Sequence, residues 1–324
     1  MEPVNSPLTI VMLGVARGQE ARLSHFLDIP HRFVAAGAGQ QPVDAVISLR
    51  YGKDEAERYV PRLIHLPGAG ADAIEFERVP PECVVCNVFE HEIPIAEYVM
   101  AAILNHAIGY VGMVRDFSSE RFGQLFEARK THAEIHGKTL GIVGFGHIGK
   151  LVTQRAQAFG MRVHAVSRSG HAPEADQAGD VSQLPDMLRQ ADFILIACPL
   201  TSATRGLIGA AQFELMKRTA VLINVSRGPI VDEEALYRAL SEGRIGGATL
   251  DVWYQYPSPE NPTPHPSRFD FEKLPRVHCT VHSCAWTAEM FDRRFAVIAD
   301  NLKRLRDGRP LLNVIRQAVA RKQN

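Results

Sequence analysis

Short apolar runs separated by amphipathic stretches fill the first hundred residues of the chain. Four runs have the length of buried strands: Leu8–Val15, Ala45–Leu49, Leu63–Leu66 and Cys83–Val88. Helical patterns lie between them, and this alternation is typical of a parallel α/β sheet. A longer helix is predicted to begin after Ile93–Pro94 and to reach about Val111.

The same rhythm restarts after a polar stretch from Arg115 to His136, which is expected to be an exposed helix or connector. Six further strand candidates follow: Thr139–Val143, Val163–Val166, Phe193–Cys198, Ala220–Val225, Ala248–Val252 and Val277–Val281. Six strands with interleaved helices are what a dinucleotide-binding sheet needs. A last helix is predicted from Ala288 to Gly308, and segment 256–274, rich in Pro, Ser and Asn, is predicted to be a long loop.

Length and charge narrow the class of protein. A chain of 324 residues favours two domains. Lys plus Arg and Asp plus Glu both total 36, and no basic block or acidic tail argues for a nucleic-acid partner. No signal peptide is recognised, and the apolar stretch Ile93–Val111 contains Glu97, Asn105 and His106, which favours a buried helix over a membrane span. We therefore expect a soluble cytoplasmic protein.

The cysteines suggest packing rather than chemistry. Cys83 and Cys86 form a CxxC, a spacing that can indicate redox or metal sites. They lie inside one apolar run, no second CxxC follows, and strand alternation places them on opposite faces. We expect reduced packing residues and no metal site.

A glycine-rich loop is the most informative local feature. Gly144, Gly146 and Gly149 have the GxGxxG spacing, an apolar run precedes them and a helical pattern follows. The first glycine permits a tight turn, the second lets backbone approach a pyrophosphate, and the third allows close helix packing. The sequence predicts a dinucleotide site here, with His147 and Ile148 at the start of the helix.

The end of the second strand of this region indicates which dinucleotide is preferred. An NAD site usually has Asp or Glu there, which accepts hydrogen bonds from the ribose hydroxyls. This chain has Ser167, Arg168 and Ser169 instead. A hydroxyl and a guanidinium suit a 2′-phosphate, so NADP is favoured and NAD remains possible. The alternative is that Arg168 is only a solvated loop residue.

Several ordered blocks resemble the D-isomer-specific 2-hydroxyacid dehydrogenase family, which includes phosphoglycerate, hydroxypyruvate/glyoxylate and formate dehydrogenases. The blocks are Leu66–Asp72, Gly137–Gly149, Pro199–Thr204, Leu222–Asp232, Leu250–Val252 and Thr280–His282. The resemblance implies two Rossmann-like or flavodoxin-like α/β domains with parallel sheets, the cofactor domain being inserted in the substrate domain. The expected boundaries are 1–104 for the first part of the substrate domain, 105–287 for the cofactor domain, and 288–324 for a helix returning to the substrate domain.

Two residues at strand ends would carry the chemistry. Arg227 follows an apolar strand, where ligands of open α/β sheets bind, and a guanidinium can grip a carboxylate and a carbonyl oxygen together. His282 follows another strand, and an imidazole can give and take a proton near neutral pH. By resemblance they are the catalytic arginine and the acid/base. Val281 stands where most members have Pro.

The third catalytic position departs from the family. A Glu normally lies five residues after the Asp of the Asp-Val pair, and here Asp251 is followed at that distance by Tyr256. A phenol can hydrogen-bond an imidazole but does not stabilise imidazolium by charge. We expect a lower pKa for His282 than in relatives with Glu. One alternative is that the carboxylate of Glu260, in the same loop, contacts His282 instead. The other is that catalysis is impaired.

The resemblance also implies the remaining contacts. Gly68, Ala69 and Gly70 resemble the loop whose backbone N–H groups bind the substrate carboxylate. Asp251 resembles the acid that contacts the nicotinamide carboxamide. The other residues expected beside the cofactor are Pro199, Thr204, Val225, Ser226 and Ser283, and Tyr51 is a candidate for shaping the substrate pocket.

The function favoured by these features is NADP-dependent reduction of a small 2-oxo acid such as glyoxylate or hydroxypyruvate, or oxidation of the D-2-hydroxy acid. Two alternatives stay open. One is a cofactor-binding regulator without turnover, and the other is a dehydrogenase of another donor such as formate or phosphite. The resemblance further implies a homodimer.

Overall fold

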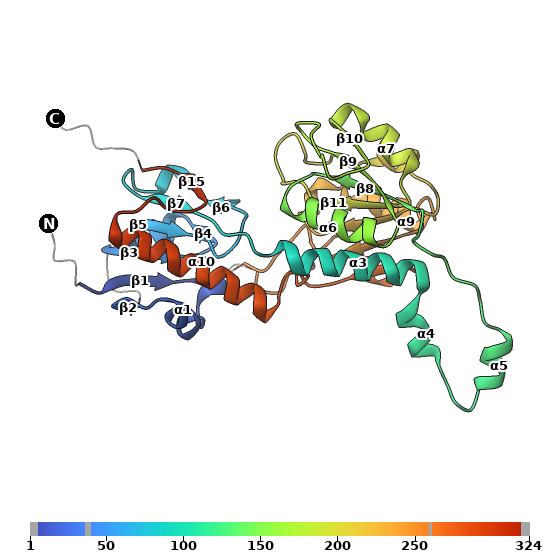
Figure 1. Cartoon of the computed structure of the whole chain (residues 1–324), viewed down its shortest axis with the longest axis horizontal. Coiled ribbons are helices and arrows are strands. Elements are labelled where there is room, and N and C mark those ends of the chain that lie inside the picture. The colour runs from blue at the N-terminus through green and yellow to red at the C-terminus, as the bar shows by residue number, and fades with distance from the viewer. Residues whose placement is uncertain (1–5, 36–39, 259–260, 319–324) are drawn as a thin grey trace. The chain divides into compact units, whose positions relative to one another are not determined.

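The computed structural model describes residues 6–35, 40–258 and 261–318. It divides into two compact units, unit 1 (Met1–His91 with Thr287–Asn324) and unit 2 (Glu92–Trp286) (Figure 1). Unit 2 is thus inserted in unit 1 along the chain. The boundary expected after residue 104 falls inside the first helix of unit 2, α3 (Glu92–Ile108).

Unit 1 is built on a six-stranded sheet with the order β15-β7-β5-β3-β1-β2. The strands are β1 (Leu8–Met12), β2 (His31–Phe33), β3 (Gln41–Ile47), β5 (Tyr59–His65), β7 (Val84–Cys86) and β15 (Val314–Arg316). All pairs are parallel except β15 with β7. Without β15 this is the flavodoxin-like order 2-1-3-4-5. A separate pair joins β4 (Arg50–Tyr51) to β6 (Ala73–Ile74).

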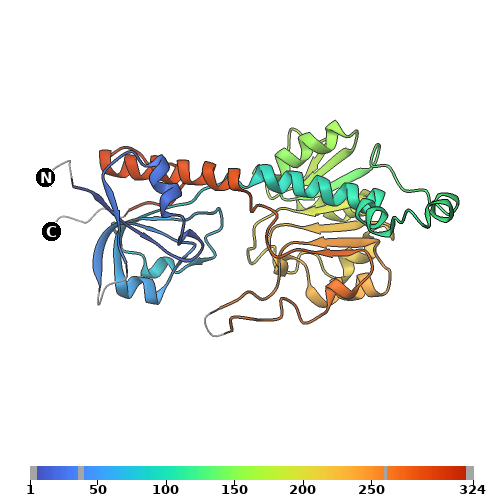
Figure 2. The same ribbon diagram turned by 90° about the horizontal axis from the view of Figure 1, so that it is seen from below.

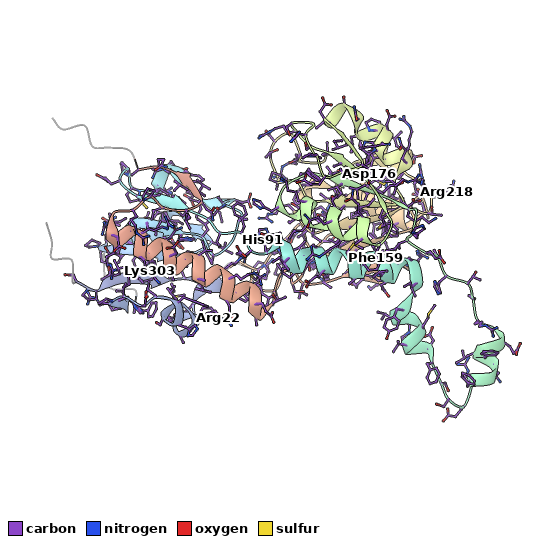
Figure 3. All side chains as sticks on the ribbon, in the orientation of Figure 1. Arg22, His91, Phe159, Asp176, Arg218 and Lys303 are labelled. Atoms are coloured by element: carbon purple, nitrogen blue, oxygen red, sulfur yellow. The ribbon has the colours of Figure 1, made fainter. Side chains whose placement is uncertain are left out.

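Apolar clusters lie on both faces of this sheet. Helices α1 (Glu20–Phe26) and α10 (Ala288–Asp307) pack together on one face, and α2 (Lys53–Arg58) follows β4. Salt bridges from Arg22 to Asp292 and from Lys303 to Asp28 tie α10 to its neighbours. Arg22 and Lys303 are labelled in Figure 3. Helix α10 ends at Gly308, which is left-handed, as the sequence predicts.

Unit 2 is built on seven parallel strands with the order β10-β9-β8-β11-β12-β13-β14. They are β8 (Thr139–Val143), β9 (Arg162–Val166), β10 (Gln177–Gly179), β11 (Phe193–Ile196), β12 (Val221–Asn224), β13 (Gly247–Leu250) and β14 (Val277–Cys279). The first six follow the Rossmann order 3-2-1-4-5-6. The prediction of two parallel α/β sheets is confirmed. The count of six strands was wrong, because β10 is a short edge strand without an apolar run.

Helices cover both faces of the second sheet. α3 and α6 (His147–Ala158) share one apolar cluster with the sheet, and α7 (Leu184–Gln190), α8 (Ala210–Leu215) and α9 (Glu233–Ser241) share the other. Single 3-10 turns complete the fold: Gly14–Ala16, Phe76–Arg78, Val181–Gln183, Gly228–Ile230 and Phe271–Lys273. No helix among the described residues is long and apolar enough to cross a bilayer.

An arm extends from unit 2. The helix expected to reach Val111 breaks at Gly109, which is left-handed, and continues as α4 (Tyr110–Asp116) and α5 (Phe122–Glu127) (Figures 1 and 2). The chain returns where the Ala133 amide donates to the carbonyl oxygen of Ala107. Neither arm helix contains a buried residue.

The prediction that the two CxxC cysteines are packing residues on opposite faces of a strand is confirmed. Cys83 and Cys86 are free and buried, and they belong to the apolar clusters on opposite faces of the unit 1 sheet. Burial raises the pKa of both thiols to about 12, which keeps them protonated and unreactive at neutral pH.

Candidate active site

Three neighbouring strands of unit 2 end in register. Asn224 of β12 pairs with Leu250 of β13, which pairs with Cys279 of β14. Because parallel strands end at one edge of a sheet, the turns that follow them leave side by side. Arg227, Trp253 and His282 each lie three positions after one of these paired residues.

The turn after β12 is shaped to present Arg227. The buried amide of Asn224 donates to the carbonyl oxygen of Arg227 at 3.0 Å and accepts from the Ser226 N–H at 3.1 Å. Gly228 follows because a Cβ there would lie 2.5 Å from the carbonyl oxygen of Trp253. This glycine therefore lets the turns after β12 and β13 approach each other closely.

The turn that carries His282 is held by one carboxylate. Asp251 is fully buried and accepts hydrogen bonds from the Thr280 hydroxyl (2.6 Å), the Ser283 N–H (2.9 Å) and the Cys284 N–H (3.0 Å). His282 itself has φ 59°, a left-handed conformation that is costly outside glycine. The three hydrogen bonds hold it there, and contact of Asp251 with a carboxamide stays a prediction.

Tyr256 lies beside the imidazole, as expected from its position in the sequence. Its phenolic oxygen is 2.9 Å from His282 Nδ1 and accepts from the Trp253 N–H at 3.1 Å. The arrangement that satisfies all three groups has the phenol donating to Nδ1. A neutral His282 then carries its own proton on Nε2, an assignment that follows from the hydrogen-bond pattern.

The electrostatics of the site favour a neutral imidazole. Desolvation lowers the pKa of His282 below its ordinary value, the negative charge of Asp251 opposes this, and the positive charge of Arg227 adds to it. Desolvation raises the pKa of Tyr256, while Arg227 pulls it down. The charge of Arg227 thus acts on both rings, and the three residues follow the neighbouring strands β12, β13 and β14 at one edge of the sheet.

The glycine loop lies at the end of β8, where the order of strands in the sheet reverses. Gly144 has φ 97°, and a Cβ there would sit 2.5 Å from the backbone of Cys198. A Cβ on Gly149 would sit 3.0 Å from the Gly144 carbonyl oxygen. Gly146 precedes α6, and its missing side chain leaves open space at the start of that helix. Backbone N–H groups at the start of a helix of this kind form a cradle that can hold an anion.

The end of β9 carries the residues predicted to select the cofactor. Ser167 is half-buried, with its hydroxyl 3.4 Å from that of Ser169. Arg168 is exposed and has no carboxylate partner among the described residues. His147 and Ile148 are the first two residues of α6.

The other predicted cofactor neighbours lie at the same edge of the sheet. The Thr204 hydroxyl donates to the Pro199 carbonyl oxygen at 2.7 Å. The Ser226 hydroxyl donates to the Cys198 carbonyl oxygen. Val225 is buried. Ser283 is exposed beside His282. All five therefore follow the carboxyl ends of β11, β12 or β14.

The remaining candidates belong to other segments of the chain. Gly68, Ala69 and Gly70 belong to unit 1 and follow β5. Tyr51 is fully buried and its hydroxyl donates to the Tyr59 carbonyl oxygen at 2.9 Å, so it is a core residue. Glu260 lies outside the described residues.

Residues 100–284 match the sequence model of the D-isomer specific 2-hydroxyacid dehydrogenase NAD binding domain. The chain belongs to this family. It therefore contains a domain for a nicotinamide dinucleotide.

Individual relatives are similar over shorter stretches. The D-3-phosphoglycerate dehydrogenase of Methanocaldococcus jannaschii is 33% identical over 260 residues, which are 78% of this chain and 47% of that protein. The glyoxylate reductase of Thermococcus kodakarensis is 48% identical over 126 residues, 38% of each chain. The aligned part is thus about half or less of these curated relatives.

A solved structure matches nearly the whole chain. The NADPH-dependent glyoxylate/hydroxypyruvate reductase of Sinorhizobium meliloti, in complex with NADP and sulfate, superposes with a TM-score of 0.76. The match covers 96% of this chain and 98% of that one, at 25% identity.

Sequence reasoning missed the groups that hold the rings of Tyr256 and His282 in place. The Trp253 amide fixes Tyr256, and Thr280 bridges Asp251 to the Tyr98 hydroxyl at 2.7 Å. A backbone amide has no signature in sequence, since every residue except proline has one. The signal that could have found Thr280 is its place two residues before His282 at a strand end.

Proposed function

We propose that this chain reduces small 2-oxo acids of the glyoxylate or hydroxypyruvate type to D-2-hydroxy acids with NADPH. Unit 2 serves as the cofactor domain, and unit 1 as the substrate domain that carries the Gly68–Gly70 loop. The observation that supports this most is the grouping of Arg227, His282 and Tyr256 at one sheet edge. A cation and a proton donor beside a dinucleotide cradle are what carbonyl reduction needs.

Each side chain has a defined task in this reaction. The guanidinium of Arg227 holds the carboxylate and the carbonyl oxygen, and its charge stabilises the oxyanion that develops there. His282 donates a proton from Nε2 to that oxygen. Tyr256 orients the imidazole through Nδ1. The bound dinucleotide would supply the hydride.

The cradle fits a dinucleotide, because Gly146 leaves open space at the start of α6. A Cβ on Gly144 would collide with the Cys198 backbone, and one on Gly149 would lie tightly against the Gly144 carbonyl oxygen. Arg168 and Ser167 support NADP over NAD, since no acidic residue stands there to accept from an unmodified ribose. The S. meliloti reductase, solved with NADP, is consistent with this preference.

The test is a panel of glyoxylate, hydroxypyruvate, pyruvate and formate with NADPH and NADH, followed at the nicotinamide absorbance. We expect reduction of the small 2-oxo acids with NADPH and its loss, by at least about 10³-fold, in Arg227→Ala. Tight NADPH binding without turnover of any substrate would favour a regulator instead. NADP reduction with formate would favour the other donor class.

We further propose a homodimer in which the arm of one copy packs on a second copy. Large apolar side chains are exposed along it: Tyr110, Val111, Met113, Val114, Phe117, Phe122 and Phe126. Helices of six or seven residues are unstable alone in water, so these faces need a partner. Five free cysteines, four of them buried, fit a cytoplasmic location.

A further inference from the structure

Three successive carbonyl groups in the loop after β5 accept hydrogen bonds. The Pro67 carbonyl oxygen accepts from Arg294 Nη1 at 3.1 Å. That of Gly68 accepts from the Val88 N–H at 3.2 Å, and that of Ala69 accepts from the Asn87 side-chain amide at 2.9 Å. Three consecutive peptide groups are thus oriented by three separate donors.

This orientation determines where the N–H groups of the same peptides point. In a trans peptide the N–H is antiparallel to the C=O, so the amides of Gly68, Ala69 and Gly70 point away from those donors. None of these three amides has an acceptor among the residues that the structure describes. Successive unpaired N–H groups with only hydrogen or methyl side chains form a cradle for an anion.

Arg294 is the donor that comes from outside this part of the chain. It lies on α10, more than two hundred residues later in the sequence. Its Nε donates to the Phe89 carbonyl oxygen at 2.9 Å while Nη1 reaches Pro67, so one guanidinium ties two loops together. The planar fork of arginine allows this, and a lysine has one nitrogen for the same task.

The neighbouring arginine holds the second loop in a costly conformation. Glu90 has φ 69°, and Arg293 donates both to its carboxylate and to its carbonyl oxygen at 3.1 Å. A non-glycine residue in this region of conformational space persists only when its surroundings impose it. Both loops are therefore positioned from one helix, α10.

We propose that Arg294 is a positioning residue for substrate: it turns the 67–69 carbonyls away so that the amides of residues 68–70 face the substrate carboxylate. This inference rests on the proposed function, which makes that carboxylate the ligand of the loop. Arg294 acts through the loop and touches no reacting atom.

The test compares Arg294→Lys with Arg304→Lys. Arg304 is a matched control, because it lies on the same helix and donates to a carbonyl oxygen, that of Pro310, at 3.0 Å. For Arg294→Lys we expect the KM for glyoxylate and the Kd for oxalate, measured calorimetrically with NADPH bound, to rise about tenfold. The Kd for NADPH should change less than about twofold, and Arg304→Lys should resemble wild type.

If Arg294→Lys fails to fold, Asn87→Asp removes the donor to Ala69 and gives the same expected pattern. Unchanged oxalate affinity and KM in a folded variant overturn the inference, as does an equal loss of NADPH affinity. A wild-type protein that neither reduces 2-oxo acids nor binds oxalate refutes the proposed function itself. The two failures are therefore distinguishable.

Discussion

A phenol stands beside His282, at the position where the family resemblance implies a glutamate. Under the proposed function, this difference affects the acid/base chemistry of the imidazole. Proton donation requires the imidazolium form. Because desolvation and Arg227 lower the pKa of His282, that form is lost at a lower pH than for an ordinary histidine. The activity for reduction should be highest on the acidic side and should fall as pH rises through this lowered pKa.

Tyr256→Glu should reverse this effect. A carboxylate close to Nδ1, in place of the phenol that contacts it, stabilises imidazolium and raises the pKa of His282. The falling limb of kcat/KM for glyoxylate against pH should move upward by the same amount. The measurement is the full pH–rate profile of both proteins, and an unshifted limb would refute the account.

Tyr256→Phe is the control for charge. It removes the hydrogen bond without adding a carboxylate, so the falling limb should stay on the acidic side. The rate should drop about tenfold because the imidazole loses the group that orients it. Nitrogen-15 shifts of His282 should also show less of the Nε2–H tautomer in this variant.

Arg168 should determine cofactor preference. Arg168→Gln removes a cation that has no carboxylate partner among the described residues, so little else should change. We expect the KM for NADPH to rise about tenfold while that for NADH stays within twofold. Initial rates with each cofactor measure this. Equal changes in both values would mean that the side chain does not contact a 2′-phosphate.

The sequence could indicate which residues stand at the site but not how each is held. Arg227 and His282 follow apolar runs, and strand ends of a parallel sheet meet at one edge, so their approach was predictable. The hydrogen bonds of Asp251 to the His282 turn were not. They depend on strands β13 and β14 being neighbours, which is a property of the assembled sheet.

At the scale of elements, alanine substitutions at two glycines of one loop should affect different properties. One should lower the stability of the protein, and the other should weaken cofactor binding. Gly144→Ala places a Cβ 2.5 Å from the Cys198 backbone at a left-handed φ, and should cost about 2–4 kcal/mol of unfolding free energy. Gly146→Ala meets open space, so its stability should match wild type. Its Kd for NADPH should rise about tenfold, because the methyl occupies the anion cradle.

Urea unfolding and fluorescence titration of NADPH measure the two effects. The prediction fails if Gly146→Ala binds NADPH normally, or if Gly144→Ala is as stable as wild type. The pair is informative because both residues are glycines of the same loop and both variants add one methyl group. What differs is the surroundings of that methyl and the backbone conformation, with φ 97° at Gly144 and −104° at Gly146.

The elements that were predicted correctly are those with long apolar runs. β11 and β12 are buried along their whole length, β8 is buried after its first residue, and α10 has a clear stop at Gly308. The short strands β2, β10 and β15 were missed because edge strands are half exposed and have no continuous apolar run. The helix break at Gly109 was missed because apolar residues continue beyond it into the arm.

At the scale of the whole molecule, the arm is the feature that a single copy leaves unexplained. Phe117, Phe122 and Phe126 are 63%, 57% and 50% exposed, and α4 and α5 bury no side chain. The apolar residues that continue past Gly109 into the arm are explained if a partner covers the arm in the assembled protein, because they are then removed from water. A second copy of the chain is the partner that is always present at matching concentration.

Replacing Phe122 and Phe126 by Asp should convert a dimer into a monomer, because burying two carboxylates in an apolar interface costs several kcal/mol. Sedimentation velocity at micromolar protein measures the change. Val181→Asp is the control, since Val181 is 50% exposed in the same unit but away from the arm, and it should remain dimeric. A wild-type chain that sediments as a monomer, or an arm variant that stays dimeric, would show that the arm faces something other than a second copy.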